Sequence, residues 1–172
     1  MRHLFAVMLA LLATPLWAVT LDTPFENIDG GTFSLDQWAG HPILVVNTAS
    51  QCGFTGQYAG LQKLYDTYRN RGLVVVAVPS NDFNQELDSN AAVKKFCEVQ
   101  YGLDMPMTGI TPVTGDGAHP FYRSLRAEQG FAPRWNFNKV LISPKGDVVA
   151  TFGATAKPMS TKLTREIEAL LN

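Results

Sequence analysis

The 172-residue chain has little cysteine and histidine, with two residues of the first and three of the second. Cys52, Cys97, His41 and His119 show no close ligand spacing, so no metal site is expected. No glycine-rich phosphate-binding loop occurs, so no nucleotide cofactor is expected either. Charged residues make up only 17% of the chain, and its net charge of -1 comes without a basic stripe. The sequence therefore argues against a metalloenzyme, a nucleotide-dependent enzyme and a protein that binds nucleic acid or anionic membranes.

The N-terminal segment has the order of a secretory signal peptide. Its start is basic, residues 4–12 are apolar, and Ala18 supplies a small residue at the end. The apolar run is shorter than the roughly 20 residues of a membrane-spanning helix and is followed by Pro15, which favours a cleaved leader over an uncleaved anchor. We therefore expect export to the periplasm or secretion, without stable membrane insertion of the mature protein. The predicted organisation is a signal peptide at residues 1–18 and a single domain at residues 19–172.

Apolar runs and turn residues predict the order hairpin, βαβ unit, helix, hairpin, helix. This order is typical of an α/β, thioredoxin-like fold, with a central mixed sheet flanked by helices and an N-terminal β-hairpin extension. The predicted elements are a hairpin within 25–35, a helical turn at 35–40, strands at 43–46, 73–78, 139–142 and 148–152, helices at 57–69, 89–101 and from 119, and a C-terminal helix with Leu163, Ile167, Leu170 and Leu171 on one face.

Cys52 lies in a polar turn between a predicted strand and a predicted helix. A thiol just before a helix N-terminus lies near the partial positive charge of that end, which favours the thiolate. Free cysteines are also often buried as small hydrophobic residues, and this alternative applies to Cys52 as well. A polar turn that contains glycine is a poor place for a packing cysteine, so the position favours nucleophilic chemistry.

Four segments of the chain resemble the glutathione peroxidase family, and the resemblance spans residues 19–172. They are Asn47-Thr48-Ala49-Ser50-Gln51-Cys52-Gly53-Phe54-Thr55, Pro79-Ser80-Asn81-Asp82-Phe83-Asn84-Gln85-Glu86, Ala118-His119-Pro120-Phe121-Tyr122 and Trp135-Asn136-Phe137-Asn138-Lys139. The resemblance implies a thiol-dependent peroxidase without a cofactor. Its substrates would be hydrogen peroxide and organic or lipid hydroperoxides, which it would reduce to water or alcohols through a sulfenic acid.

The resemblance also assigns roles to individual residues. Cys52 corresponds to the peroxidatic nucleophile, and Gln85, Trp135 and Asn136 correspond to the side chains around its sulfur. These three side chains can donate hydrogen bonds to a sulfur anion and to the oxygen that leaves when the O–O bond breaks. Because donors suffice, no histidine base is needed, and we expect His119 to be structural or to start a helix.

Two features of the site segments differ from other members of the family. Some members carry selenocysteine at the nucleophile, so Cys52 implies lower intrinsic reactivity with the same reaction type. The segment that ends at Gln85 is one residue shorter than its commoner form, which affects the reach of the Gln85 side chain. The stretch from Leu125 to Trp135 is also short compared with the insertion of tetrameric relatives. It predicts a monomer with an open, shallow site.

Cys97 is the candidate resolving cysteine. In relatives that use thioredoxin, a second cysteine on the helix after the glutamine segment forms a disulfide with the sulfenic acid. Cys97 lies on that predicted helix, one position before the usual place. Phe96 and Val99 are expected to face the core, so a packing role for Cys97 stays open. The reductant is accordingly a thioredoxin-like protein or glutathione.

Two other functions use the same residues. A thiol-based peroxide sensor would pass the oxidation of Cys52 to a partner rather than turn over repeatedly. A peroxiredoxin or disulfide oxidoreductase would share the fold, but the chain has no Cys-x-x-Cys motif and lacks the proline and threonine pattern that precedes the nucleophile of peroxiredoxins. The peroxidase of glutathione peroxidase type therefore remains the leading prediction.

Overall fold

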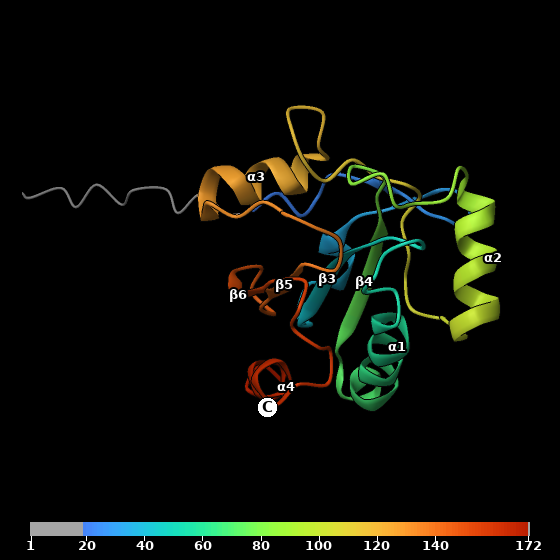
Figure 1. The fold of residues 1–172 in the computed structure, drawn as a ribbon. Helices are drawn as coiled ribbons and strands as arrows, with labels where there is room; N and C mark the ends of the chain where they lie inside the picture. Colours follow the sequence, from blue (N-terminus) through green and yellow to red (C-terminus); the bar gives the residue numbers. More distant parts are fainter. Residues whose placement is uncertain (1–18, 172) are drawn as a thin grey trace, which may run out of the picture.

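The computed structural model describes residues 19–171, so the predicted leader lies outside the described residues. A four-stranded sheet forms its centre, in the order β4-β3-β5-β6 (Figure 1). Strand β3 pairs in parallel with β4 and antiparallel with β5, so the central sheet is mixed, as predicted. The strands are β3 (Ile43–Thr48), β4 (Val74–Pro79), β5 (Lys139–Ile142) and β6 (Val148–Phe152).

The remaining elements follow the predicted order. A two-stranded antiparallel hairpin precedes the sheet, and Gly30 and Gly31 take positive φ at its turn. The C-terminal helix ends earlier than expected, so Leu170 and Leu171 lie beyond its end. The elements are β1 (Phe25–Glu26), β2 (Thr32–Phe33), the short 3₁₀ helices η1 (Leu35–Trp38) and η2 (Arg69–Arg71), α1 (Gln57–Tyr68), α2 (Asn90–Tyr101), α3 (Pro120–Gln129) and α4 (Thr161–Glu168).

The side chains of β3 alternate between two hydrophobic cores. Leu44 and Val46 pack with residues of α1, α2 and α4, whereas Ile43 and Val45 pack with α3 and the hairpin. Figure 1 shows α1 and α4 together on one side of the sheet and α3 on the other. All six residues of β3 are buried, which explains why its first four residues form a continuous apolar run rather than an alternating pattern.

Local signals set the helix boundaries. Gly72 takes φ +103° after η2 and ends the α1–η2 segment, as its position predicted. The Ser89 hydroxyl accepts a hydrogen bond from Ala92 N at the start of α2. His119 begins α3, where its ring accepts a hydrogen bond from Phe121 N at 3.3 Å. The expectation that His119 starts a helix is therefore confirmed.

The orientation of α2 differs from the prediction. Val93 and Cys97, four residues apart, form its buried stripe. Val99 is 69% exposed and Phe96 is half-buried, so the expectation that both face the core is wrong for Val99. The helical period explains the difference, because a stripe through Val93 and Cys97 leaves Val99 about 200° away from Cys97.

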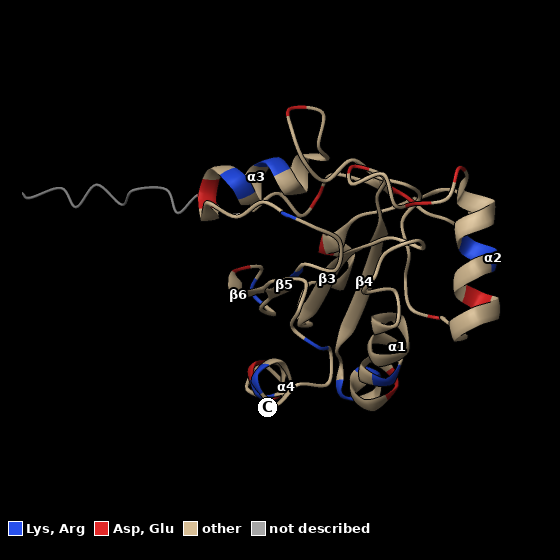
Figure 2. Ribbon diagram, viewed as in Figure 1, with Lys and Arg blue, Asp and Glu red and all other residues tan. Residues whose placement is uncertain are grey.

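Charges are mixed over the described surface. Figure 2 shows basic and acidic residues interspersed on the helices, while β3 and β4 carry neither. Within residues 19–171, no helix is both long and apolar enough to cross a membrane.

Candidate active site

Cys52 lies in a turn of residues 49–56, which we call the Cys52 loop, between the end of β3 and the start of α1. The side chain of Thr55 accepts a hydrogen bond from Cys52 N at 3.0 Å, and Thr55 N returns one to Cys52 O. Phe54 N donates to Cys52 Sγ at 3.4 Å. The helix α1 starts at Gln57, as predicted, and the rest of the Cys52 loop separates the thiol from its first residue. The backbone N–H of Phe54, in the same loop, is the donor that contacts the sulfur.

The segment that carries Gln85 is bonded directly to the Cys52 loop. Gln51 N donates to Gln85 O at 2.9 Å, and Ser50 N donates to Glu86 Oε1 at 3.0 Å. Asn84 takes φ +55°, a left-handed conformation that turns the chain just before Gln85. The shortened segment therefore still reaches the Cys52 loop.

The second site segment, residues 135–138, which we call the Trp135 turn, is held by Asn47 at the end of β3. Asn47 Nδ2 donates to Trp135 O at 3.0 Å, and Asn47 Oδ1 accepts from Asn138 N at 3.1 Å. The main-chain oxygen of Asn47 accepts a further bond from Phe137 N at 2.6 Å. Since β3 continues from Asn47 into the Cys52 loop, the Cys52 thiol and the Trp135 turn lie at the same end of the sheet.

Gln85 and Asn136 are in direct contact. Asn136 is fully buried, and its Nδ2 donates to Gln85 Oε1 at 3.0 Å. This bond uses the acceptor end of the Gln85 amide, so its NH₂ group remains available as a donor. Asn136 Oδ1 has no hydrogen-bond partner among residues 19–171. Trp135 is 40% exposed, and its ring centroid lies 5.4 Å from that of Phe83 at the surface.

Cys97 is placed differently from the other predicted site residues. It is fully buried in α2, and burial raises the pKa of its thiol to about 12. Tyr58, whose hydroxyl lies beside Cys97, is also buried, and burial raises the pKa of that hydroxyl well above its usual value. Cys52 and Cys97 are both free thiols and belong to the same hydrophobic core.

Lys139 is a residue of the site that the sequence analysis did not single out. It is fully buried at the start of β5, and its Nζ donates to Gln57 Oε1 at 2.7 Å and to Phe137 O at 2.8 Å. Burial lowers the pKa of its ammonium group to about 7. Phe137 takes φ +62°, so Lys139 binds the carbonyl of a left-handed residue and links it to the first residue of α1. The signal in the sequence was a lysine at the first position of an otherwise apolar strand.

Glu86 is a second residue near the site that the sequence analysis did not single out. Its Oε1 accepts hydrogen bonds from Ser50 N and Leu87 N, while its Oε2 is buried without a partner among residues 19–171. Burial is the main cause that raises the pKa of its carboxyl group, against these hydrogen bonds, which lower it. Its position beside Gln85 was the only signal in the sequence. Within the described residues no group of three or more His, Cys, Asp or Glu side chains could hold a metal ion.

Residues 21–126 match the family model described as glutathione peroxidase. The chain belongs to the glutathione peroxidase family. As a member of that family, it is a hydroperoxide-reducing oxidoreductase that depends on a thiol reductant, as the sequence resemblance implied. The hydroperoxy fatty acid reductase gpx1 of Synechocystis sp. is 40% identical over 155 residues, which cover 84% of this chain and 90% of the relative.

Solved structures agree with this family and with the predicted fold. The apo form of Trgpx is similar to this glutathione peroxidase with a TM-score of 0.69 and 29% identity, over 92% of this chain and 97% of that one. A thiol:disulfide interchange protein of the thioredoxin family from Chlorobium tepidum shares the fold alone, with a TM-score of 0.69 and 16% identity over 90% and 97% of the two chains. The thioredoxin-like α/β fold is therefore confirmed.

Proposed function

We propose that Cys52 is the peroxidatic nucleophile of this glutathione peroxidase, and that Gln85, Trp135 and Asn136 supply the donors around the reacting oxygens. The observation that carries the proposal is the hydrogen bond between Asn136 and Gln85, which leaves the Gln85 NH₂ group free beside the loop of Cys52. The bond between Gln51 N and Gln85 O supports the same arrangement, because it fixes the Gln85 backbone next to that loop.

The first half of the reaction transfers one oxygen to sulfur. The Cys52 thiolate attacks the terminal peroxide oxygen, an S–O bond forms, and the O–O bond breaks. The departing oxygen leaves as hydroxide or alkoxide and takes a proton to become water or alcohol, while Cys52 becomes a sulfenic acid. Amide and indole N–H donors stabilise this departing oxygen as its negative charge develops. Phe54 N, which donates to Cys52 Sγ, supports the thiolate before the attack.

The second half returns Cys52 to the thiol. We propose that the Cys97 thiol condenses with the sulfenic acid, releasing water and leaving a disulfide that a thioredoxin-like protein reduces. Because Cys97 is buried and its pKa is about 12, α2 must shift or unwind locally before Cys97 reacts. Glutathione is the alternative reductant, and it would attack the sulfenic acid directly without Cys97.

The mass of the intact, leader-free chain after one equivalent of hydrogen peroxide tests both halves. A loss of about two mass units, absent from the Cys52→Ser variant, is expected for a Cys52–Cys97 disulfide. A gain of about sixteen units on Cys52 would instead mean a sulfenic acid that waits for an external thiol, with a structural Cys97. No rapid change would contradict the assignment of Cys52, and oxidation without repeated turnover would indicate a peroxide sensor.

Cys97→Ser separates the two halves of the cycle. The variant is expected to keep the first turnover, because Cys52 and its donors are untouched, but to lose recycling by a thioredoxin-like protein. A matched Val99→Ser variant changes an exposed residue of the same helix and serves as the control. Unchanged steady-state turnover in Cys97→Ser would remove Cys97 from the mechanism.

Substrate range, assembly and location complete the proposal. The Synechocystis relative is named for its reduction of hydroperoxy fatty acids, which supports organic and lipid hydroperoxides as substrates beside hydrogen peroxide. The short stretch from Leu125 to Trp135 supports a monomer, which light scattering would test. The leader expected at residues 1–18 supports a periplasmic or secreted protein, and fractionation of cells that express the full chain would test it.

A further inference from the structure

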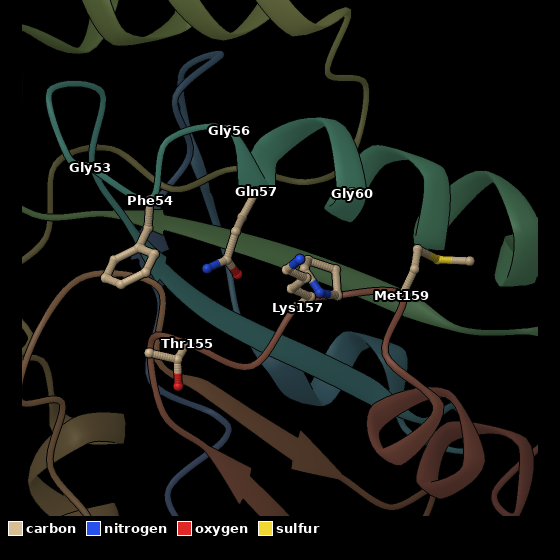
Figure 3. A pocket seen from close by; sticks show the side chains of 9 residues that line it. Gly53, Phe54, Gly56, Gln57, Gly60, Thr155, Lys157 and Met159 are labelled. Atoms are coloured by element: carbon tan, nitrogen blue, oxygen red, sulfur yellow. The ribbon is translucent and has the colours of Figure 1, made fainter.

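A cavity of about 440 Å³ opens beside the Cys52 loop. Gly53 and Phe54, the two residues after Cys52, form one end of it, and the segment of residues 155–159 faces them from the other side of the opening (Figure 3). Its volume lies within the range of small-molecule sites. The residues that define it are Phe54, Gln57, Gly60, Thr155, Lys157 and Met159, and we call it the tail cavity.

The walls of the tail cavity are mostly apolar, and their main polar side chain is already bonded. Gln57 Oε1 accepts from Lys139 at 2.7 Å, and Gln57 Nε2 donates to Ala154 O at 2.6 Å. Both ends of this amide are therefore occupied. A ligand in the cavity would meet carbon surface, which favours an aliphatic group over a polar one.

One cation stands at the cavity. Lys157 is exposed, and within residues 19–171 no carboxylate forms an ion pair with it. Figure 3 shows Phe54 and Thr155 at one end of the cavity and Met159 at the other, with Lys157 between them. An apolar cleft with one unpaired ammonium group complements an aliphatic chain that carries a single negative charge.

We propose that the tail cavity binds the carboxylate-bearing arm of a long-chain hydroperoxide. The arm lies along Phe54 and Thr155, its carboxylate pairs with Lys157, and the peroxide group is directed to Cys52. The proposal rests on the function proposed above and adds a binding site outside the peroxide-reacting residues. Since burying a methylene changes affinity by up to about fourfold, chain length should control binding.

Calorimetry with saturated fatty acids tests the site without any redox chemistry. Cys52→Ser protein is expected to bind dodecanoate at one site and to bind octanoate more weakly, by up to about fourfold for each methylene removed. Thr155→Trp fills the cavity from an exposed position and should weaken dodecanoate binding at least about tenfold. Thr151→Trp, an exposed residue outside the cavity, is the control for added bulk. Affinity that is independent of chain length, or equal in both tryptophan variants, would overturn the proposal.

The charge of Lys157 is tested in the same way. Lys157→Glu should weaken dodecanoate binding by about tenfold, whereas Lys145→Glu, an exposed lysine in the β5–β6 turn, should not. Dodecanol lacks the carboxylate, so its binding is expected to respond little to Lys157→Glu. An equal loss for dodecanol and dodecanoate would contradict the pairing with Lys157.

Turnover then connects the cavity to catalysis. In Thr155→Trp the ratio of kcat/KM for a linoleic acid hydroperoxide to kcat/KM for hydrogen peroxide should fall, relative to Thr151→Trp. An equal fall for both peroxides would assign the effect to the Cys52 loop and overturn the proposal, as would a change confined to the KM for a reductant protein. If the wild-type protein consumed neither peroxide, the proposed function would fail. The binding of dodecanoate to Cys52→Ser would still show whether the tail cavity binds a fatty-acid chain.

Discussion

The buried ammonium of Lys139 predicts a specific dependence of stability on pH. An unfolded lysine has a pKa near 10.5, and burial lowers the pKa of Lys139 to about 7 in the folded protein. Between these two values the unfolded chain binds more protons than the folded one, so the free energy of unfolding rises with pH. Integration from about pH 7 to pH 9 gives a gain of about 2 kcal/mol, and from about pH 6 to pH 7 only about 0.4 kcal/mol.

The assay compares Lys139→Met with the wild type by urea unfolding at about pH 6, 7, 8 and 9. Methionine keeps most of the side-chain volume and removes the titrating group, so the difference between the two proteins isolates Lys139. Lys145→Met, which changes an exposed lysine, is the matched control and should follow the wild type at every pH. The variant also loses the hydrogen bonds to Gln57 and Phe137, which lowers its free energy of unfolding by the same amount at every pH. Comparing the change with pH, rather than the values themselves, removes this contribution.

The outcome reports the charge of the Lys139 side chain that binds the Phe137 carbonyl in the Trp135 turn. Between about pH 7 and pH 9, the free energy of unfolding of the wild type should rise by about 2 kcal/mol more than that of Lys139→Met. This result would mean that Lys139 loses its proton near neutral pH in the folded protein. If the difference in the free energy of unfolding between the two proteins stayed constant from about pH 7 to pH 9, the reasoning would be refuted. Lys139 would then keep its proton in the folded protein, and burial would not lower its pKa.

Further predictions concern the residues that hold the site together. Asn47→Asp keeps the acceptor for Asn138 N but loses the donor to Trp135 O, so it should slow Cys52 oxidation less than Asn47→Ala does; stopped-flow measurement of peroxide consumption will rank them. Glu86→Gln should be more stable than the wild type at about pH 7 and lose that advantage near pH 4, because burial raises the pKa of the carboxyl group; urea unfolding at both pH values checks it. Gly72→Ala should destabilise the protein by about 1 kcal/mol or more, since φ is +103° there; its melting temperature should fall.

The order of the elements could be predicted from local signals. The apolar run at β3, the turn glycines of the hairpin and the Ser89 cap each act within a few residues, and the structure confirms all three. The face of α2 was harder to assign, because Phe96 and Val99 are as apolar as the residues that are buried. Only packing against the rest of the core selects the stripe of Val93 and Cys97.

The arrangement of the candidate site required the structure. The resemblance named Gln85 and Asn136 separately, but their mutual hydrogen bond joins positions 51 residues apart. No periodicity reports such a contact. Lys139 and Glu86 were missed for another reason, because charged residues are rarely buried and composition places them at the surface. Their partners are mostly backbone groups, which carry no signal in the sequence.

The pairing of Asn47 with the Trp135 turn also sets the order in which the site can form during synthesis. The hydrogen bond from Asn138 N to Asn47 Oδ1 spans 91 positions, so it cannot form until most of the chain has left the ribosome. Before that point a nascent chain carries the Cys52 thiol without Asn136 and the indole of Trp135. In the mechanism proposed above, the sulfur therefore gains these two donors only when β5 joins the central sheet, which would restrict the proposed peroxide chemistry to nearly completed molecules.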